Sequence, residues 1–266
     1  MIRPPMTPRK KIWRTRWRDR RAGYWMRKLK GRPPAANSAP IQMDFPPEPG
    51  AALDPRPPVR IYIGTEAGQA RAERVLVWSI LKHRQPSRAY EIYAMRDIAG
   101  FEHNAWKTGF SHYRYAIPDF AGREGRAIYN DVDQIYLADP AELFDLEMGE
   151  AGVMDIDGHD TSVMLIDCAK MALVWPRSFA EAGERRHRDF RARRDEAGLW
   201  GGIDSAWNAR DGEYREGVTK LVHYTTLQMQ PWRPFPGELR YQDHPDAGLW
   251  LALEAEADAA GFALPE

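Results

Sequence analysis

The sequence contains a single cysteine, Cys168, and lacks any long apolar run. One cysteine excludes a disulfide within the chain, which is typical of proteins from a reducing compartment. No stretch reaches the roughly 18 to 20 apolar residues that a membrane-spanning helix requires, and no apolar segment follows the basic N-terminus as in a secretory signal. We therefore expect a cytoplasmic protein. Because Cys168 lies within an apolar run, we expect a buried core residue rather than a reactive thiol.

The chain also lacks a net charge, since 38 basic residues balance 38 acidic ones, but the charges are unevenly distributed. Residues 1–34 hold 13 Lys and Arg and one acid, which leaves 25 basic and 37 acidic residues elsewhere, a net charge of −12. Within this basic arm Trp13, Trp17 and Tyr24 share one helical face. Such an arm suits the anionic inner surface of a membrane. Docking on a partner or on its own domain is an alternative, whereas the acidic remainder makes nucleic acid an unlikely partner.

Proline separates the arm from the rest of the chain. Residues 35–58 are rich in proline, which helices and central strands exclude, so we expect a linker there and a globular domain over residues 59–266. Strand-like and helical patterns alternate in that domain, and this predicts an α/β fold with a central mixed sheet flanked by helices. The expected strands are 59–63, 90–94, 127–129, 153–154, 163–167 and 218–224, and the expected helices are 70–82, 140–144 and 248–261.

The most informative segment is Asn130-Asp131-Val132-Asp133, which directly follows the strand-like residues 126–129. In an extended chain, side chains at i and i+2 point to the same face. Two carboxylates sharing a face repel unless a cation lies between them. Divalent metals take oxygen ligands of this kind, and ligands of α/β sheets bind beyond the carboxyl ends of strands. The segment therefore predicts a metal-diphosphate site, and a turn or capping role is the alternative.

Residues 126–144 resemble the metal-site segment of glycosyltransferase family 8, in which an apolar strand leads to Tyr-Leu-Asp-x-Asp and Glu-Leu-Phe follows. The resemblance extends over roughly residues 59–235. It implies a single GT-A-type domain with a Rossmann-like sheet, which uses manganese or magnesium and a UDP-sugar donor. It also implies transfer of a hexose-type sugar with retention, and the basic arm suggests a glycan or lipid-linked acceptor at the membrane. Four other segments resemble family motifs in the same order: 61–82, 113–118, 162–167 and 221–232.

The expected metal ligands are Asp131, Asp133 and His223, and an imidazole beside two carboxylates favours manganese over magnesium or calcium. A packed or surface histidine is the alternative for His223, but the Pro-Trp motif that follows favours a ligand. Arg114 is a candidate for contact with the donor phosphates or sugar, since a guanidinium pairs bidentately with oxyanions. A surface salt bridge is its alternative. Gly64 would allow close backbone approach to the nucleotide, and Trp232 either stacks on a ring or packs in the core. The full set of donor-binding candidates is Gly64, Thr65, Glu66, Arg114, Asp131, Gln230 and Trp232.

Several features depart from the family pattern. Asp160-Thr161-Ser162 stands where the family has Asn-Ser-Gly, and Thr226 stands where the family has the glycine after its histidine. Gln230 stands where the family has a lysine that reaches the diphosphate, and residues 202–208 only loosely match the segment facing the sugar's reactive carbon. Asp155, Asp157 and Asp204 are therefore the candidates for contact with sugar hydroxyls or for the catalytic position, with Asp204 and Asp155 preferred for catalysis and a structural role as the alternative for each. The missing lysine makes a non-catalytic binding module of the same fold the second hypothesis, and a nucleic-acid binder through the arm is the third.

The acceptor site is expected in two variable loops, residues 96–112 and 176–215. The second loop is rich in arginine, and we expect a charged helix there rather than a lid or an anion-binding patch.

Overall fold

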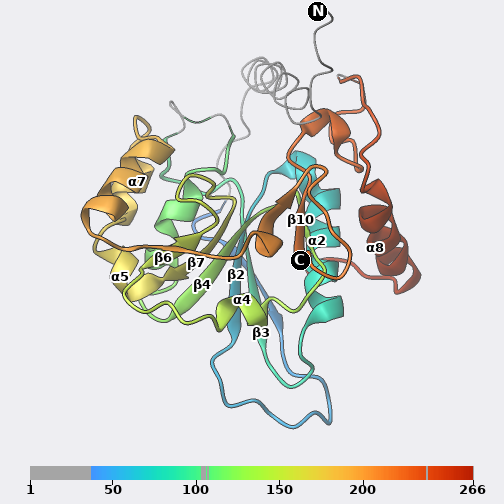
Figure 1. The fold of residues 1–266 in the computed structure, drawn as a ribbon, viewed down its shortest axis with the longest axis horizontal. Coiled ribbons are helices and arrows are strands. Elements are labelled where there is room, and N and C mark those ends of the chain that lie inside the picture. The colour runs from blue at the N-terminus through green and yellow to red at the C-terminus, as the bar shows by residue number, and fades with distance from the viewer. Residues whose placement is uncertain (1–36, 103–105, 107, 238, 266) are drawn as a thin grey trace, which may run out of the picture.

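The computed structural model describes residues 37–102, 106, 108–237 and 239–265, and a seven-stranded mixed sheet forms the centre of this part (Figure 1). Strands β2, β3 and β4 run parallel, while β7 lies antiparallel between β4 and β6. The strand order is β1-β3-β2-β4-β7-β6-β8, with bounds β1 Ile41–Phe45, β2 Val59–Gly64, β3 Tyr90–Met95, β4 Arg126–Asp131, β6 Val153–Asp155, β7 Val163–Asp167 and β8 Trp200–Gly202. The predicted α/β architecture is confirmed.

Helices cover both faces of this sheet, because successive side chains of each buried strand point to opposite faces. Ile61 and Ile63 of β2 pack in one core with helix α2 (Ala70–His83) and helix α8 (Ala247–Ala259), which lie side by side in Figure 1. Tyr62 joins a second core on the opposite face. The helices lining that second core are η2 Tyr113–Ala116, α3 Ile117–Phe120, α5 Cys168–Ala172, α6 Arg177–Glu181 and α7 His187–Glu196.

Cys168 belongs to this second core and is fully buried, as predicted. Burial raises the pKa of its thiol to about 12, so the reactive thiolate is disfavoured. The arginine-rich segment also forms the expected charged helix, α7, although one of its arginines, Arg194, is buried.

A second, smaller sheet places His223 close to the two predicted aspartate ligands. Its order is β5-β10-β9, and β10 pairs antiparallel with β5, so that His223 lies opposite Gln134. Because β5 begins directly after Asp133, this pairing brings two distant segments together. The strand bounds are β5 Gln134–Tyr136, β9 Ala209–Arg210 and β10 Leu221–His223, and the remaining short helices are η1 Ala67–Gln69, α4 Ala141–Phe144, η3 Ser205–Asn208 and η4 Leu227–Met229.

The folded domain begins earlier than the sequence predicts. Residues 41–45, inside the expected linker, form β1, which pairs antiparallel with β3 from Ile41–Ala94 to Phe45–Tyr90. A strand flanked by proline fits the edge of a sheet, where one side needs no backbone partner. The late strand is also shorter than residues 218–224, since β10 covers three residues. The predicted arm, residues 1–34, lies outside the described residues.

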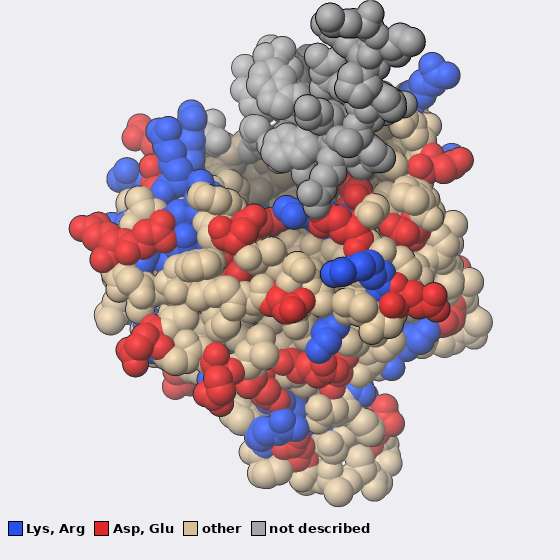
Figure 2. All heavy atoms as spheres, in the orientation of Figure 1, with Lys and Arg blue, Asp and Glu red and all other residues tan. Residues whose placement is uncertain are grey.

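The surface gives two further observations. None of the helices in the described ranges has the length and apolar character to span a bilayer. Over the described residues of the face in Figure 2, acidic side chains are interspersed with the basic ones. Nucleic-acid-binding proteins instead gather basic residues on one face, so this face is unlike theirs.

Candidate metal and donor site

Strand β4 delivers Asp131 to the carboxyl edge of the large sheet, where the chain turns through Val132 and Asp133 into β5. Two backbone hydrogen bonds fix this turn. The Asp131 N–H donates to the Ser162 carbonyl at 3.0 Å, and the Val132 N–H donates to the Gly64 carbonyl at 3.2 Å. Both carboxylates are therefore held on a rigid strand end rather than on a long loop.

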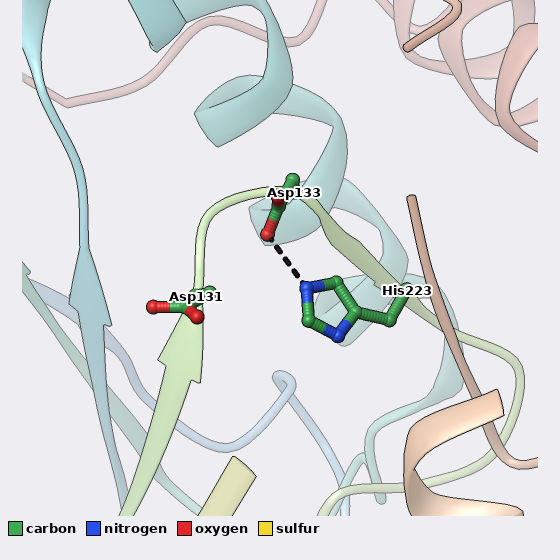
Figure 3. A group of neighbouring side chains, drawn as sticks. All are labelled: Asp131, Asp133 and His223. Carbon is green, nitrogen blue, oxygen red and sulfur yellow. Dashed lines mark hydrogen bonds and ion pairs between the residues drawn. The ribbon is translucent and has the colours of Figure 1, made fainter. Parts of the chain in front are cut away.

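Asp131, Asp133 and His223 come together at this edge, as the sequence predicts (Figure 3). One ligand atom from each residue lies within 4.8 Å of the others. His223 is buried and its Nε2 lies 3.1 Å from Asp133 Oδ1. Two carboxylates and one imidazole at this spacing form a ligand set that fits a divalent metal such as manganese.

The electrostatics of the group depend on the protonation of His223. Burial favours the neutral imidazole, but the negative charges of Asp133, Asp160 and Asp131 and the hydrogen bond to Asp133 outweigh it and raise the pKa of His223 to about 9. Burial and the neighbouring Asp133 raise the pKa of Asp131, against the opposing effect of Arg114. Without a metal, the imidazolium therefore serves as counter-cation for the carboxylates.

Arg114 holds the carboxylate of Asp131 in place. Its Nη2 donates to Asp131 Oδ1 at 2.8 Å, and the Tyr129 hydroxyl donates to the same oxygen. The guanidinium also donates to Thr161 and Ser111 and lies over the Tyr129 ring, 4.3 Å from its centroid. Arg114 is only 3% exposed, so it is not a surface salt bridge. Asp131 Oδ2 accepts no hydrogen bond from the described residues, so this oxygen remains available to a ligand.

Asn208 orients the imidazole from the other side. Its side-chain amide donates to Ser162 Oγ at 3.0 Å and to Asp160 Oδ2 at 3.2 Å. The amide oxygen therefore faces His223 Nδ1, 2.9 Å away, and accepts its proton. This directs Nε2 towards Asp133. Burial would raise the pKa of Asp160, but His223 and the hydrogen bonds from Ser162 lower it.

The sequence reasoning missed Asn208 and Asp160 as parts of this site. Asn208 ended the loosely matched segment 202–208, and Asp160 was noted only as a departure from a family motif. Support of a ligand by an amide and a second carboxylate is common at metal sites, but it has no fixed spacing along the chain.

Gln230 lies directly against Asp133, one of the three expected metal ligands. Its amide nitrogen donates to Asp133 Oδ2 at 3.2 Å and to the Tyr224 carbonyl at 3.0 Å. Gln230 is 4% exposed, and its Oε1 is buried with no hydrogen-bond partner among the described residues. Gln230 therefore lies beside an expected metal ligand, and its predicted role towards a donor stays a prediction.

A buried network anchors the loop that carries Gln230. Asp211 accepts hydrogen bonds from the Thr225 and Thr226 hydroxyls at 2.7 and 2.6 Å and from His244 Nε2 at 3.2 Å. Burial opposes ionisation, yet these hydrogen bonds lower the pKa of Asp211 to about 2. The loop after β10 is thus tied to a carboxylate that is ionised at neutral pH.

The other donor-binding candidates have partners within the protein. Gly64 is required by packing, since a Cβ there would clash with the Tyr129 hydroxyl and the Phe110 ring. Thr65 is buried and donates to Glu73 at 3.0 Å, while Glu66 lies partly exposed beside η1. Their predicted nucleotide contacts remain predictions.

Trp232 packs in the core, which is the second of the two roles expected for it. It is 3% exposed, its indole N–H donates to Gln69 at 2.6 Å, and its ring lies 5.4 Å from that of Trp250. A buried indole in this packing presents no free face for stacking on a nucleotide base.

The two catalytic candidates differ in exposure. Asp155 is fully buried and pairs with Arg194 Nη1 at 3.0 Å, and burial raises the pKa of its carboxyl group. Direct contact between Asp155 and a sugar is therefore disfavoured. Asp204 is exposed and caps η3 by accepting from the Ala206 N–H at 2.7 Å, which leaves its second oxygen open.

Comparisons with known proteins identify the fold. No family model matches the sequence, and no curated protein matches it either. The apo-form glycosyltransferase GlyE of Streptococcus pneumoniae TIGR4 matches with a TM-score of 0.53 at 15% identity, over 79% of this chain and 66% of that one. The bifunctional glycosyltransferase WbbM matches with a TM-score of 0.53 at 13% identity, over 77% of this chain and 51% of that one.

The galactosyltransferase LgtC, solved in complex with donor and acceptor sugar analogues, matches with a TM-score of 0.50 at 13% identity. The match covers 78% of this chain and 98% of that one, whereas this chain spans about two thirds of GlyE and half of WbbM. At these identities the likeness establishes the architecture, which is that of a single GT-A-type domain.

Proposed function

We propose that this protein is a metal-dependent glycosyltransferase, which moves a sugar from a nucleotide-sugar donor to a glycan or lipid-linked acceptor. The observation that carries the proposal is the convergence of Asp131, Asp133 and His223 at the carboxyl edge of a GT-A-type sheet. This edge is where open α/β sheets bind their ligands. A divalent metal bound there would neutralise charge on the departing nucleotide diphosphate.

The protein's own contribution is preorganisation. Arg114 and Tyr129 hold one oxygen of Asp131 and leave the other for a ligand. Asn208 fixes the ring of His223 with its Nε2 towards the shared position. Supporting hydrogen bonds of this kind orient metal ligands before binding and spare the site a rearrangement.

The finer features of the proposal come from the resemblance of residues 126–144 and 221–232 to glycosyltransferase family 8. They are a UDP donor, a hexose-type sugar, retention of configuration and manganese or magnesium as the metal. The similar protein LgtC was solved with donor and acceptor sugar analogues, which supports two sugar sites on this fold. The basic arm, residues 1–34, supports a cytoplasmic protein held peripherally at an anionic membrane surface, where lipid-linked acceptors are found.

A non-catalytic binding module is the second candidate, and Gln230 favours it. This residue places an uncharged amide, not an ammonium group, beside Asp133. The described lysines make ion pairs elsewhere: Lys82 with Glu256, Lys170 with Asp167, and Lys220 with Glu142. Charge on the leaving group must be stabilised during transfer. Replacement of the family's lysine by Gln230 would therefore reduce turnover more strongly than it would reduce metal binding.

A thermal-shift screen against UDP-, GDP-, ADP- and CMP-sugars, with and without manganese, tests the donor site. We expect one nucleotide class to stabilise the protein only with manganese, and the Asp131→Asn/Asp133→Asn variant to lose this shift. Asp44→Asn, an exposed carboxylate on the edge strand β1, is the matched control and should retain it. A shift that is independent of both metal and carboxylates would refute the proposed site.

Donor hydrolysis with the nucleotide sugar so identified separates the two candidates. An enzyme should release free nucleotide slowly and faster with acceptor. A binding module should show the metal-dependent shift but no release, and Gln230→Lys should then introduce measurable release.

A further inference from the structure

Trp200 is a large aromatic side chain on the last strand of the sheet, and 44% of its surface is exposed. Strand β8 pairs parallel with β6, so that Trp200 lies opposite Val153 and Gly202 opposite Asp155. Strands β4 and β6 both run antiparallel to β7, and β8 runs parallel to β6. Strands β4, β6 and β8 therefore all end at the sheet edge that carries Asp131. Three strand spacings separate β8 from β4, about 14 Å across the sheet. Trp200 is the first residue of β8 and lies level with Ala127 of β4, four residues before Asp131 along the strand direction.

The indole of Trp200 is held in one orientation by a buried ion pair. Its Nε1–H donates to Asp155 Oδ1 at 3.0 Å. The carboxylate of Asp155 is fully buried, bound to Arg194 Nη1 at 3.0 Å and to the Gly158 N–H at 2.5 Å. An exposed ring that is already immobilised loses little conformational entropy when a ligand binds it.

Glycines keep the surroundings of the indole open. A Cβ at Gly158 would lie 3.6 Å from the indole and one at Gly202 would lie 3.9 Å away, but neither residue has a side chain. Gly158 also has a φ of +76°, a conformation that favours glycine. Beside these glycines along the chain are two exposed carboxylates, Asp157 and Asp204, each with one oxygen that accepts from backbone N–H groups.

We propose that Trp200 is a stacking platform for a neutral pyranose ring of the acceptor, with Asp157 and Asp204 as acceptors for its hydroxyl groups. The apolar C–H face of a sugar suits an exposed aromatic face, and the carboxylates supply polar contacts at its rim. The three strand spacings between β8 and β4 leave room for the donor between the platform and the metal ligands. This inference rests on the proposed transferase function and specifies its acceptor as an uncharged sugar ring.

The platform is tested by ¹⁹F NMR on the full chain labelled with 5-fluorotryptophan. The resonance missing in Trp200→Phe identifies Trp200. The probes are cellobiose, lactose and N,N′-diacetylchitobiose, each titrated without metal or nucleotide. We expect at least one disaccharide to shift this resonance saturably, and Trp200→Ala to weaken its binding by about tenfold or more. Leu173→Ala, which alters an 83% exposed apolar residue on the α5 side, should leave binding unchanged.

Three outcomes overturn the platform: no disaccharide shifts the Trp200 resonance, binding persists in Trp200→Ala, or Leu173→Ala weakens binding equally. Failure of the proposed function is read separately, from the manganese-dependent nucleotide shift. Loss of that shift with intact sugar binding would refute the transferase but not the platform. Trp200→Ala should keep the nucleotide shift, which also shows that the variant is folded.

Discussion

Binding of manganese should release close to one proton at pH 7, because His223 must lose its proton to become a ligand. In the metal-free protein the pKa of His223 is raised to about 9, chiefly by Asp133 against the effect of burial. Its Nε2–H points at Asp133 Oδ1, 3.1 Å away. A histidine binds metal through a neutral ring nitrogen, so metal and proton compete for the same atom.

The size of the effect follows from the pKa. Only about 1% of a group with a pKa near 9 is neutral at pH 7, and the neutral fraction changes about tenfold per pH unit. The apparent affinity for manganese should therefore rise about 100-fold between pH 6 and pH 8. Titration calorimetry in buffers of different ionisation enthalpy measures both the affinity and the number of protons released.

His223→Gln removes the titrating group and should flatten the pH dependence while lowering the affinity at pH 8. His83→Gln, which alters a histidine at the end of α2, is the matched control and should behave as the native protein. A native affinity that is flat between pH 6 and pH 8, or a steep dependence that survives in His223→Gln, would refute the competition between proton and metal.

Three further predictions concern the support of the site. Asn208→Ala should weaken manganese binding by roughly 10- to 100-fold in calorimetry, because His223 loses the acceptor that orients it. Arg114→Met should lower the free energy of unfolding by about 1–3 kcal/mol in urea titrations, since the partly buried Asp131 carboxylate would lose its ion-pair partner. The pKa of Asp211 is lowered to about 2, so its stabilising contribution is present above pH 4 and lost as the pH falls towards 2. Asp211→Asn should be less stable at pH 6, and its stability should fall less between pH 4 and pH 2.5.

The central strands were predictable because they are buried on both faces and carry continuous apolar runs. Strand β1 was hidden by the prolines around it, although Ile41, Met43 and Phe45 alternate as a strand does. Strand β8 was missed for another reason. It is three residues long and contains two glycines, so its strand conformation depends on pairing with β6 and not on local preference.

The functional site was likewise predictable only in part. The Asp131 and Asp133 pair is a local pattern, and resemblance to a family located His223 about 90 residues later. The residues that support these ligands could not be predicted from a local pattern or from the family resemblance. Arg114 matches its predicted neighbourhood but contacts Asp131 and not solvent, and Asn208 has no local signature at all. Side-chain hydrogen bonds between distant segments follow from the packing of the whole sheet.

One arrangement recurs at this sheet edge and links the two proposals. Asp131 ends β4, Asp155 ends β6, and each carboxylate pairs with a buried arginine from the helices of the same core. The consequences differ because Asp131 keeps one oxygen for a ligand, whereas Asp155 uses both on the protein.

Burial of both arginines fixes the two strand ends relative to one core. The spacing between the metal ligands and Trp200 is then set by strand packing and not by a loop. A transferase needs such a fixed distance between donor and acceptor sites, because the reacting groups must meet in one geometry. Asp155, a catalytic candidate in the sequence, would therefore help to position the acceptor through its ion pair with Arg194.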